Sequence, residues 1–214
     1  MTSEDGVVVC YYTKGPYEAE AARLIWSLQQ LLDVRYYVQE APTPKNWLEG
    51  VHMRARFLQH CRKMFPDQVL LSVDADAYVH SDPWAGVPDC DCDIAVHTFK
   101  RAGRQDEMLP GTLVLWPTDG TDNLLAIWAK QNKKTPDLPD RKTFALAVRA
   151  MRKNLKIAEL PPEMAWIFDL SRNAYGQRTP IIEHLQASRS NRNPSGPMDI
   201  SRMARILEID RGRS

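Results

Sequence analysis

The amino-acid sequence predicts an α/β protein in which a mostly parallel sheet is flanked by helices. Short apolar runs rich in β-branched residues alternate with segments whose apolar residues recur every three or four positions. Between Gly6 and Asp76 the order is strand, helix, strand, helix, strand, which joins parallel neighbours through right-handed crossovers. The third strand ends in two aspartates, at the edge where open α/β sheets bind ligands.

The predicted elements follow in a regular order. The first strand, residues 6–12, ends before the turn residues Gly15 and Pro16. Residues 18–32 then carry apolar side chains at helical spacing, and a second strand is expected at 34–39. After a proline-rich break, the second helix has an apolar face made of Val51, Ala55, Leu58, Cys61 and Phe65. The remaining strands are expected at 68–73, 94–98, 111–116 and 180–183, and the remaining helices near 122–130 and 140–153.

Composition limits the kind of protein that this chain can form. It has 214 residues, of which 43% are hydrophobic, and this suits one folded domain better than a disordered segment. No apolar run approaches the ~18 residues that a membrane-spanning helix needs. The acidic start, Met1–Gly6, lacks the pattern of a secretory signal, and four scattered cysteines are too few for a disulfide scaffold. We therefore expect a cytoplasmic protein with no membrane span.

Charge is balanced over the whole chain but not along it. The net charge of +1 gives no argument for non-specific nucleic-acid binding. The stretch 189–214 nevertheless holds six arginines against three acidic residues, and its later part predicts a short amphipathic helix with Ile200, Met203 and Leu207 on one face. We expect one domain over residues 1–190 and an Arg-rich tail over 191–214. Two interpretations of this tail stay open, a surface that positions a polyanionic acceptor such as nucleic acid and a flexible solvated segment.

Aspartates two residues apart occur three times, as Asp74/Asp76, Asp89/Asp91 and Asp91/Asp93. Only the first pair follows an apolar strand, where residues i and i+2 point the same way and can face one divalent cation. Oxygen ligands of this kind suit Mg²⁺ or Mn²⁺, which also bind substrate phosphates. Turn-forming or helix-capping aspartates remain an equally good interpretation of this pair alone. The other two pairs precede a strand and predict a solvated loop.

Three segments of the chain resemble one enzyme family. They are Val69-Leu-Leu-Ser-Val-Asp-Ala-Asp-Ala-Tyr-Val-His-Ser-Asp-Pro83, Met108-Leu-Pro-Gly-Thr-Leu-Val-Leu-Trp116, and Pro180-Ile-Ile-Glu-His184 with Ser188-Arg189 after it. In this order they resemble segments of GT-A nucleotide-sugar glycosyltransferases, especially the glycogenin-like and related retaining families. The resemblance covers roughly residues 6–190 and implies a GT-A type, Rossmann-like mixed sheet.

The resemblance also implies an activity, which is the metal-dependent transfer of a sugar from a nucleoside-diphosphate sugar. The expected sugar is a hexose, the expected nucleotide is UDP, and the expected stereochemical outcome is retention. The acceptor is left open. The cation would be Mn²⁺ or Mg²⁺, held by Asp74, Asp76 and His184. Asp140 would join the two aspartates in catalysis, and Gly111 and Thr112 would face the sugar or the acceptor. The donor nucleotide and diphosphate would be bound by Tyr11, Tyr12, Thr13, Arg54, Ser188 and Arg189.

Departures from the family pattern concern the donor. Arg54 stands where the family commonly has a lysine, and Asp140-Arg141 stands where related sequences often have Asp-Gln. The lysine that follows the late histidine in glycogenin-like enzymes is absent, and Arg189 is the nearest cation. An inverting reaction would need a carboxylate base, for which Asp140, Glu163 and Asp169 are the candidates.

Other interpretations remain. Arg54 shares a helix with Arg56 and Arg62, and such arginines more often lie on a solvated face. Tyr11 and Tyr12 more often pack than bind a base. Nucleotidyl transfer, or another two-carboxylate phosphoryl transfer acting on nucleotides or nucleic acid, would use the same aspartates. A zinc module on Cys90, Cys92 and His97 falls short of four ligands.

Overall fold

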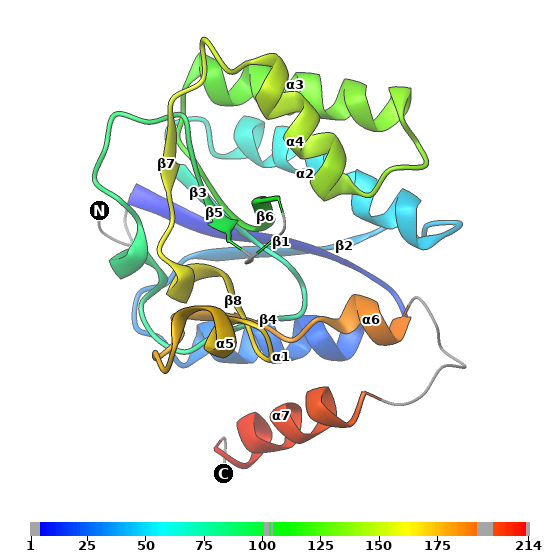
Figure 1. Cartoon of the computed structure of the whole chain (residues 1–214), viewed down its shortest axis with the longest axis vertical. Coiled ribbons are helices and arrows are strands. Elements are labelled where there is room, and N and C mark those ends of the chain that lie inside the picture. The colour runs from blue at the N-terminus through cyan, green and yellow to red at the C-terminus, as the bar shows by residue number, and fades with distance from the viewer. Residues whose placement is uncertain (1–4, 101–102, 104, 192–198, 213–214) are drawn as a thin grey trace.

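The computed structural model describes residues 5–100, 103, 105–191 and 199–212. A six-stranded sheet runs through the molecule in the order β2-β1-β3-β6-β5-β7, and a three-stranded sheet, β4-β9-β8, lies beside it (Figure 1). The strands of the large sheet are β1 (Gly6–Thr13), β2 (Tyr36–Ala41), β3 (Val69–Val73), β5 (Ile94–Phe99), β6 (Glu107–Leu115) and β7 (Ile157–Glu159). Those of the small sheet are β4 (Ala77–Val79), β8 (Trp166–Ile167) and β9 (Ile182–His184).

The large sheet is mostly parallel, as the sequence predicts. Strand β1 pairs in parallel with β2 and β3, and β5 pairs in parallel with β7. Strand β6 alone runs antiparallel to both of its neighbours, β3 and β5. The sheet is therefore the predicted mixed one, and the strand expected at 180–183 belongs to the small sheet as β9.

Helices cover both faces of the large sheet (Figure 1). One apolar cluster joins the sheet to α2, α3 and α4 and includes Trp128 and Phe144, both fully buried. The other joins the opposite face to α1 and the small sheet, through Leu24 and Ile182 among others. The helices are α1 (Glu18–Gln29), α2 (Trp47–Met64), α3 (Asp119–Lys134), α4 (Asp140–Ala150), α5 (Ser171–Tyr175), α6 (Ala187–Asn191) and α7 (Ile200–Arg211), with short 3₁₀ turns at Pro83–Gly86 and Pro162–Ala165.

Side-chain caps fix where several helices begin. The Asn46 side chain accepts a hydrogen bond from Glu49 N at the start of α2, and Glu49 in turn accepts from Lys45 N. Thr118 caps α3 by accepting from Thr121 N, and Asp199 caps α7 by accepting from Arg202 N.

The C-terminal part of the chain contains the predicted amphipathic helix as α7. Residues 192–198 and 213–214, with Arg192 and Arg213, lie outside the described residues, and the division of the chain at residue 190 stays a prediction. None of the helices in the described part of the chain combines the length and apolar character that a bilayer crossing requires.

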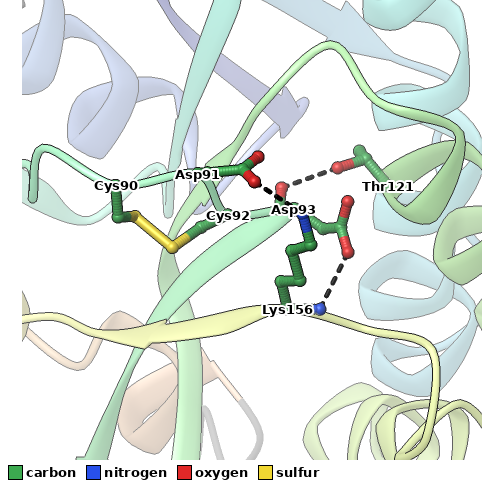
Figure 2. The surroundings of a disulfide bond; sticks show 6 residues. All are labelled: Cys90, Asp91, Cys92, Asp93, Thr121 and Lys156. Carbon is green, nitrogen blue, oxygen red and sulfur yellow. Dashed lines mark hydrogen bonds and ion pairs between the residues drawn. A yellow bond between two sulfur atoms is a disulfide. The ribbon is translucent and has the colours of Figure 1, made fainter.

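The loop before β5 differs in part from the predicted solvated loop (Figure 2). Cys90 and Cys92 form a disulfide, and Asp91 is an exposed partner of Lys156 Nζ at 2.6 Å. Asp93, in contrast, is buried. Its carboxylate accepts hydrogen bonds from Thr118 Oγ1 at 2.6 Å and from Lys156 N at 2.8 Å, which compensate for its loss of water. These bonds tie the start of α3 and the start of β7 to β5.

The zinc-module interpretation of this region does not fit the contacts. The two cysteines that it requires are bonded to each other. His97 uses both ring nitrogens elsewhere, with Nδ1 2.9 Å from Leu160 O and Nε2 2.9 Å from the Tyr175 hydroxyl.

Asp93→Ala should lower the free energy of unfolding by about 2 kcal/mol, because the Thr118 hydroxyl and the Lys156 N–H would lose their buried acceptor. Asp91→Ala, two residues away, removes only an exposed ion pair and should leave stability unchanged within error. Urea denaturation of both variants checks this expectation. Equal stability of the two variants would contradict it.

Candidate active site

Asp74 and Asp76 follow β3, at the carboxyl ends of the parallel strands β1 and β3. Asp74 N donates to Gly111 O at 2.9 Å, and Ala77 N donates to Asp74 O at 3.0 Å, so the segment turns directly after the strand. The Asp76 carboxylate accepts from Ala187 N at 2.6 Å. The turn and capping roles that the sequence left open are therefore present, but they use only one oxygen of the Asp76 carboxylate.

His184 reaches the same place from the end of β9. Strand β9 pairs antiparallel with β4, and Ala77 lies opposite His184. The His184 Nδ1 atom is 3.8 Å from Asp76 Oδ1, and one ligand atom from each of Asp74, Asp76 and His184 lies within 4.8 Å of the others. The predicted set of metal ligands is thus brought together by two strands that are distant in the sequence.

The surroundings of this cluster fit a divalent cation. His184 Nε2 is 2.7 Å from Thr112 Oγ1, which leaves Nδ1 to face the carboxylates, and metal-binding histidines usually have such a partner on the other nitrogen. Gly111 keeps the space beside the cluster clear, because a Cβ at this position would lie 2.8 Å from Asp74 Oδ2 and 3.2 Å from His184 Cε1. Two carboxylates and an imidazole are a suitable donor set for Mn²⁺ or Mg²⁺.

Strand β6 is irregular where it passes this cluster. The pairing of β5 with β6 jumps from Val96 opposite Leu113 to His97 opposite Leu109. The β6 residues 110–112 therefore have no regular partner in β5, and they include both Gly111 and Thr112. An irregular strand pair beside a site is a common way of aiming side chains.

Arg54 is buried at the centre of the site and does not lie on a solvated face. Its guanidinium donates to Asp74 Oδ1 and Pro110 O, and its Nε lies 3.3 Å from Asp140 Oδ2. Burial opposes the charge of Arg54, but Asp74 and Asp140 outweigh it and raise its pKa. Arg54 thus connects two of the predicted catalytic aspartates.

The two aspartates after β3 have different acidities. Burial raises the pKa of Asp74 to about 6, although Arg54 acts in the opposite direction. Burial has the same effect on Asp76, but His184, the Ala187 N–H and Arg202 outweigh it and hold the pKa of Asp76 below its usual value. A bound cation would favour the ionised form of both side chains.

A cleft of about 410 Å³ opens over the cluster, and every site residue predicted from the sequence lines it. Tyr11 packs on Phe57 and donates its hydroxyl to Gly50 O at 2.9 Å. Burial raises the Tyr11 pKa. Tyr12 and Thr13 follow along the end of β1, and Ser188 of α6 lines the same cleft.

Arg189 is paired within the structure. Its guanidinium binds both oxygens of Asp169, at 2.5 and 3.1 Å, and lies 5.6 Å from the centre of the Phe168 ring. The side chain is about one third exposed on the cleft wall. Of the three carboxylates considered as a base, only Asp140 lines the cleft. Asp169 instead binds Arg189, and Glu163 binds Arg178.

The cleft also contains residues to which the sequence gave no role. Glu107 and Arg141 form an ion pair of 2.7 Å on its lining, and neither has a local signature because they come from different elements. Gln186 has a positive φ of 56°, which is unusual for a residue other than glycine and recurs at functional sites. Trp47, the first residue of α2, also lines the cleft.

Comparison with solved structures of other proteins identifies the fold of this chain. No protein-family model matches the sequence, and no curated protein matches it. A glycosyltransferase involved in glycosylation of the major capsid of PBCV-1 has a similar structure, with a TM-score of 0.68, 14% identity, and coverage of 89% of this chain and 98% of that one.

Two further solved structures are similar. The glycosyltransferase GlyE of Streptococcus pneumoniae has a TM-score of 0.57 and 13% identity over 84% of this chain and 54% of its own. The galactosyltransferase LgtC, solved with donor and acceptor sugar analogues, has a TM-score of 0.50 and 10% identity over 83% of this chain and 86% of its own. The chain therefore has the GT-A type fold that the sequence predicts, while the glycogenin-like relationship stays a prediction.

Arg54→Met should lower the free energy of unfolding by about 3 kcal/mol, because it leaves the buried Asp140 and the partly exposed Asp74 without their shared cationic partner. Adding Asp140→Asn to this variant should restore part of the loss, since one unpaired charge is removed. Arg56→Met, exposed on the same helix, is the matched control and should have little effect. Chemical denaturation of the wild type, Arg54→Met, Asp140→Asn and the double variant measures the coupling, and strictly additive effects of the two substitutions would contradict it.

Proposed function

We propose that this protein is a glycosyltransferase that moves a sugar from a nucleoside-diphosphate sugar to an acceptor and uses a divalent cation bound by Asp74, Asp76 and His184. The observation that supports this most is the convergence of these three side chains inside the cleft. The fold supports it further, because the similar solved structures are glycosyltransferases.

The cation site has a role that suits this chemistry. A bound Mn²⁺ or Mg²⁺ would neutralise the donor diphosphate and the charge that it gains as it leaves the sugar. The residues of the chain supply the rest. Thr112 holds His184 through Nε2, and Arg54 holds Asp74 through Oδ1, so the ligand atoms are fixed before a donor binds.

The donor would lie between the end of β1 and α6. Tyr11, Tyr12 and Thr13 would contact the base and ribose, and we propose UDP as the nucleotide. Ser188 and Arg189, which line the same cleft, would contact the diphosphate, and the Arg189 guanidinium offers parallel donors to phosphate oxygens. Arg189 would exchange its Asp169 partner for the phosphate, which its partial exposure allows.

The sugar would occupy the space beside Gly111, and we propose that it is a hexose transferred with retention. An inverting reaction needs a free carboxylate base for the acceptor. Asp140, Glu163 and Asp169 each form an ion pair with an arginine, so none of these three carboxylates is free to accept a proton from the acceptor without leaving that partner. In a retaining reaction the leaving phosphate can accept the proton of the acceptor instead.

Nucleic acid receives no support as the acceptor. The sequence placed this option on the arginines of the tail, but Arg202 and Arg205 of α7 bind the carboxylates of Glu20 and Glu183. These contacts neutralise the charge that a polyanion would need.

Titration calorimetry with UDP should detect binding at least about tenfold tighter with Mn²⁺ or Mg²⁺ than without, since cation and diphosphate bind each other. Asp76→Asn should remove this difference and leave the melting temperature nearly unchanged, because the amide oxygen can still accept from Ala187 N. Asp91→Asn, an exposed change outside the cleft, serves as the control. UDP binding that is identical with and without metal would contradict the proposal, and preference for UTP together with release of diphosphate would favour nucleotidyl transfer.

A further inference from the structure

Helix α7 is joined by side-chain hydrogen bonds to β9, the strand that carries His184. Arg205 binds the Glu183 carboxylate with two parallel hydrogen bonds, from Nε to Oε1 at 2.9 Å and from Nη2 to Oε2 at 2.7 Å. Only 2% of Glu183 is exposed, and its other partner is His80 Nε2 at 2.8 Å. Arg205 therefore binds the residue directly before His184.

A second arginine of α7 binds the residue directly after His184. Arg202 Nε donates to Leu185 O at 2.7 Å, while its Nη2 donates to Glu20 Oε1 at 2.5 Å. Glu20 belongs to α1, so Arg202 also anchors α7 to the body of the protein. The two arginines lie about one helical turn apart and therefore face the same neighbour.

The same stretch of backbone contacts Asp76 from its other side. Leu185 N donates to Asp76 O at 3.0 Å, and Ala187 N donates to the Asp76 carboxylate. Successive residues of a strand point to opposite faces, so the Glu183 side chain faces α7 while the His184 side chain faces the cleft. The segment from Glu183 to Ala187 is thus held between α7 and one of the carboxylates.

We propose that Arg202 and Arg205 are positioning residues for the metal site, and that α7 sets the place of His184 relative to Asp74 and Asp76. This inference rests on the proposed function, because it assumes that these three side chains bind the cation. Removal of Arg205 leaves Glu183 buried with His80 as its remaining partner, and β9 would relax toward solvent to hydrate the carboxylate. His184 would then move away from its working position.

The contacts of α7 favour this role over simple coverage of the core. A covering helix buries an apolar stripe, but Ile200, Met203 and Leu207 are 76%, 43% and 52% exposed. Ile209 is the one buried apolar residue of α7. The helix is held instead by its charged side chains. Two of them, Arg202 and Arg205, bind the residues on either side of His184.

The test compares Mn²⁺ binding to full-length variants, by the electron paramagnetic resonance signal of free Mn²⁺. Arg205→Ala should lower the affinity by about 10- to 100-fold, as is typical for residues that hold a metal ligand in place. Arg205→Lys keeps the charge but not the two parallel bonds, and should give an intermediate loss. Arg62→Ala is the matched control, since it removes a buried arginine that binds backbone carbonyls at the other end of β3, and it should leave the affinity unchanged.

Amide hydrogen exchange at Leu185 is a second readout that needs no metal. The amide of Leu185 should exchange at least about tenfold faster in Arg205→Ala than in the wild type and the Arg62→Ala control, because β9 opens more often. Wild-type Mn²⁺ affinity and wild-type exchange in Arg205→Ala would overturn the inference. If wild-type protein binds no Mn²⁺ but the Leu185 amide exchanges faster in Arg205→Ala, the proposed function is contradicted. The stabilisation of β9 by Arg205 of α7 is then still supported.

Discussion

The site depends on one constraint, which is that two carboxylates lie close together after β3, with Asp76 buried and the Asp74 side chain about one third exposed. Burial and mutual repulsion both oppose their ionisation, so the surrounding chain must supply positive charge and hydrogen-bond donors. Arg54 does this for Asp74, and the Ala187 N–H, His184 and Arg202 do it for Asp76. The proposed cation site rests on the geometry of these groups, since one ligand atom from each of Asp74, Asp76 and His184 lies within 4.8 Å of the others.

Successive layers of the chain position His184, the third of the proposed cation ligands. The small sheet brings β9 beside the turn that follows Asp76, and α7 then holds β9 from outside. Within the large sheet, the irregular part of β6 supplies the hydroxyl of Thr112 to His184, and Gly111, which has no Cβ, lets Asp74 and His184 approach its backbone closely. A histidine that must face two carboxylates is therefore fixed through its ring, its strand and its neighbours, as expected for a preorganised metal site.

Local patterns in the sequence account for much of this. Apolar periodicity predicts the strands and helices around the cleft, and strand order predicts that Asp74, Asp76 and Tyr11 meet at one edge. Neither pattern predicts the burial of Arg54. A helix with several arginines is typical of a solvated surface, and only the tertiary structure places Asp74 and Asp140 beside Arg54. The same holds for Asp93 and for α7, whose charged partners are distant in the sequence. Tertiary ion pairs leave no local periodicity, so only the structure reveals them.

The central claim is that Asp74, Asp76 and His184 bind one cation. Crystals grown with Mn²⁺ and UDP, measured with X-rays near the manganese absorption edge, test it most directly. The account predicts one strong anomalous peak in contact with Asp74, Asp76 and His184 Nδ1, with the diphosphate of UDP on the open side of the ion. A peak elsewhere in the cleft, or bound UDP with no anomalous peak between these side chains, would contradict it.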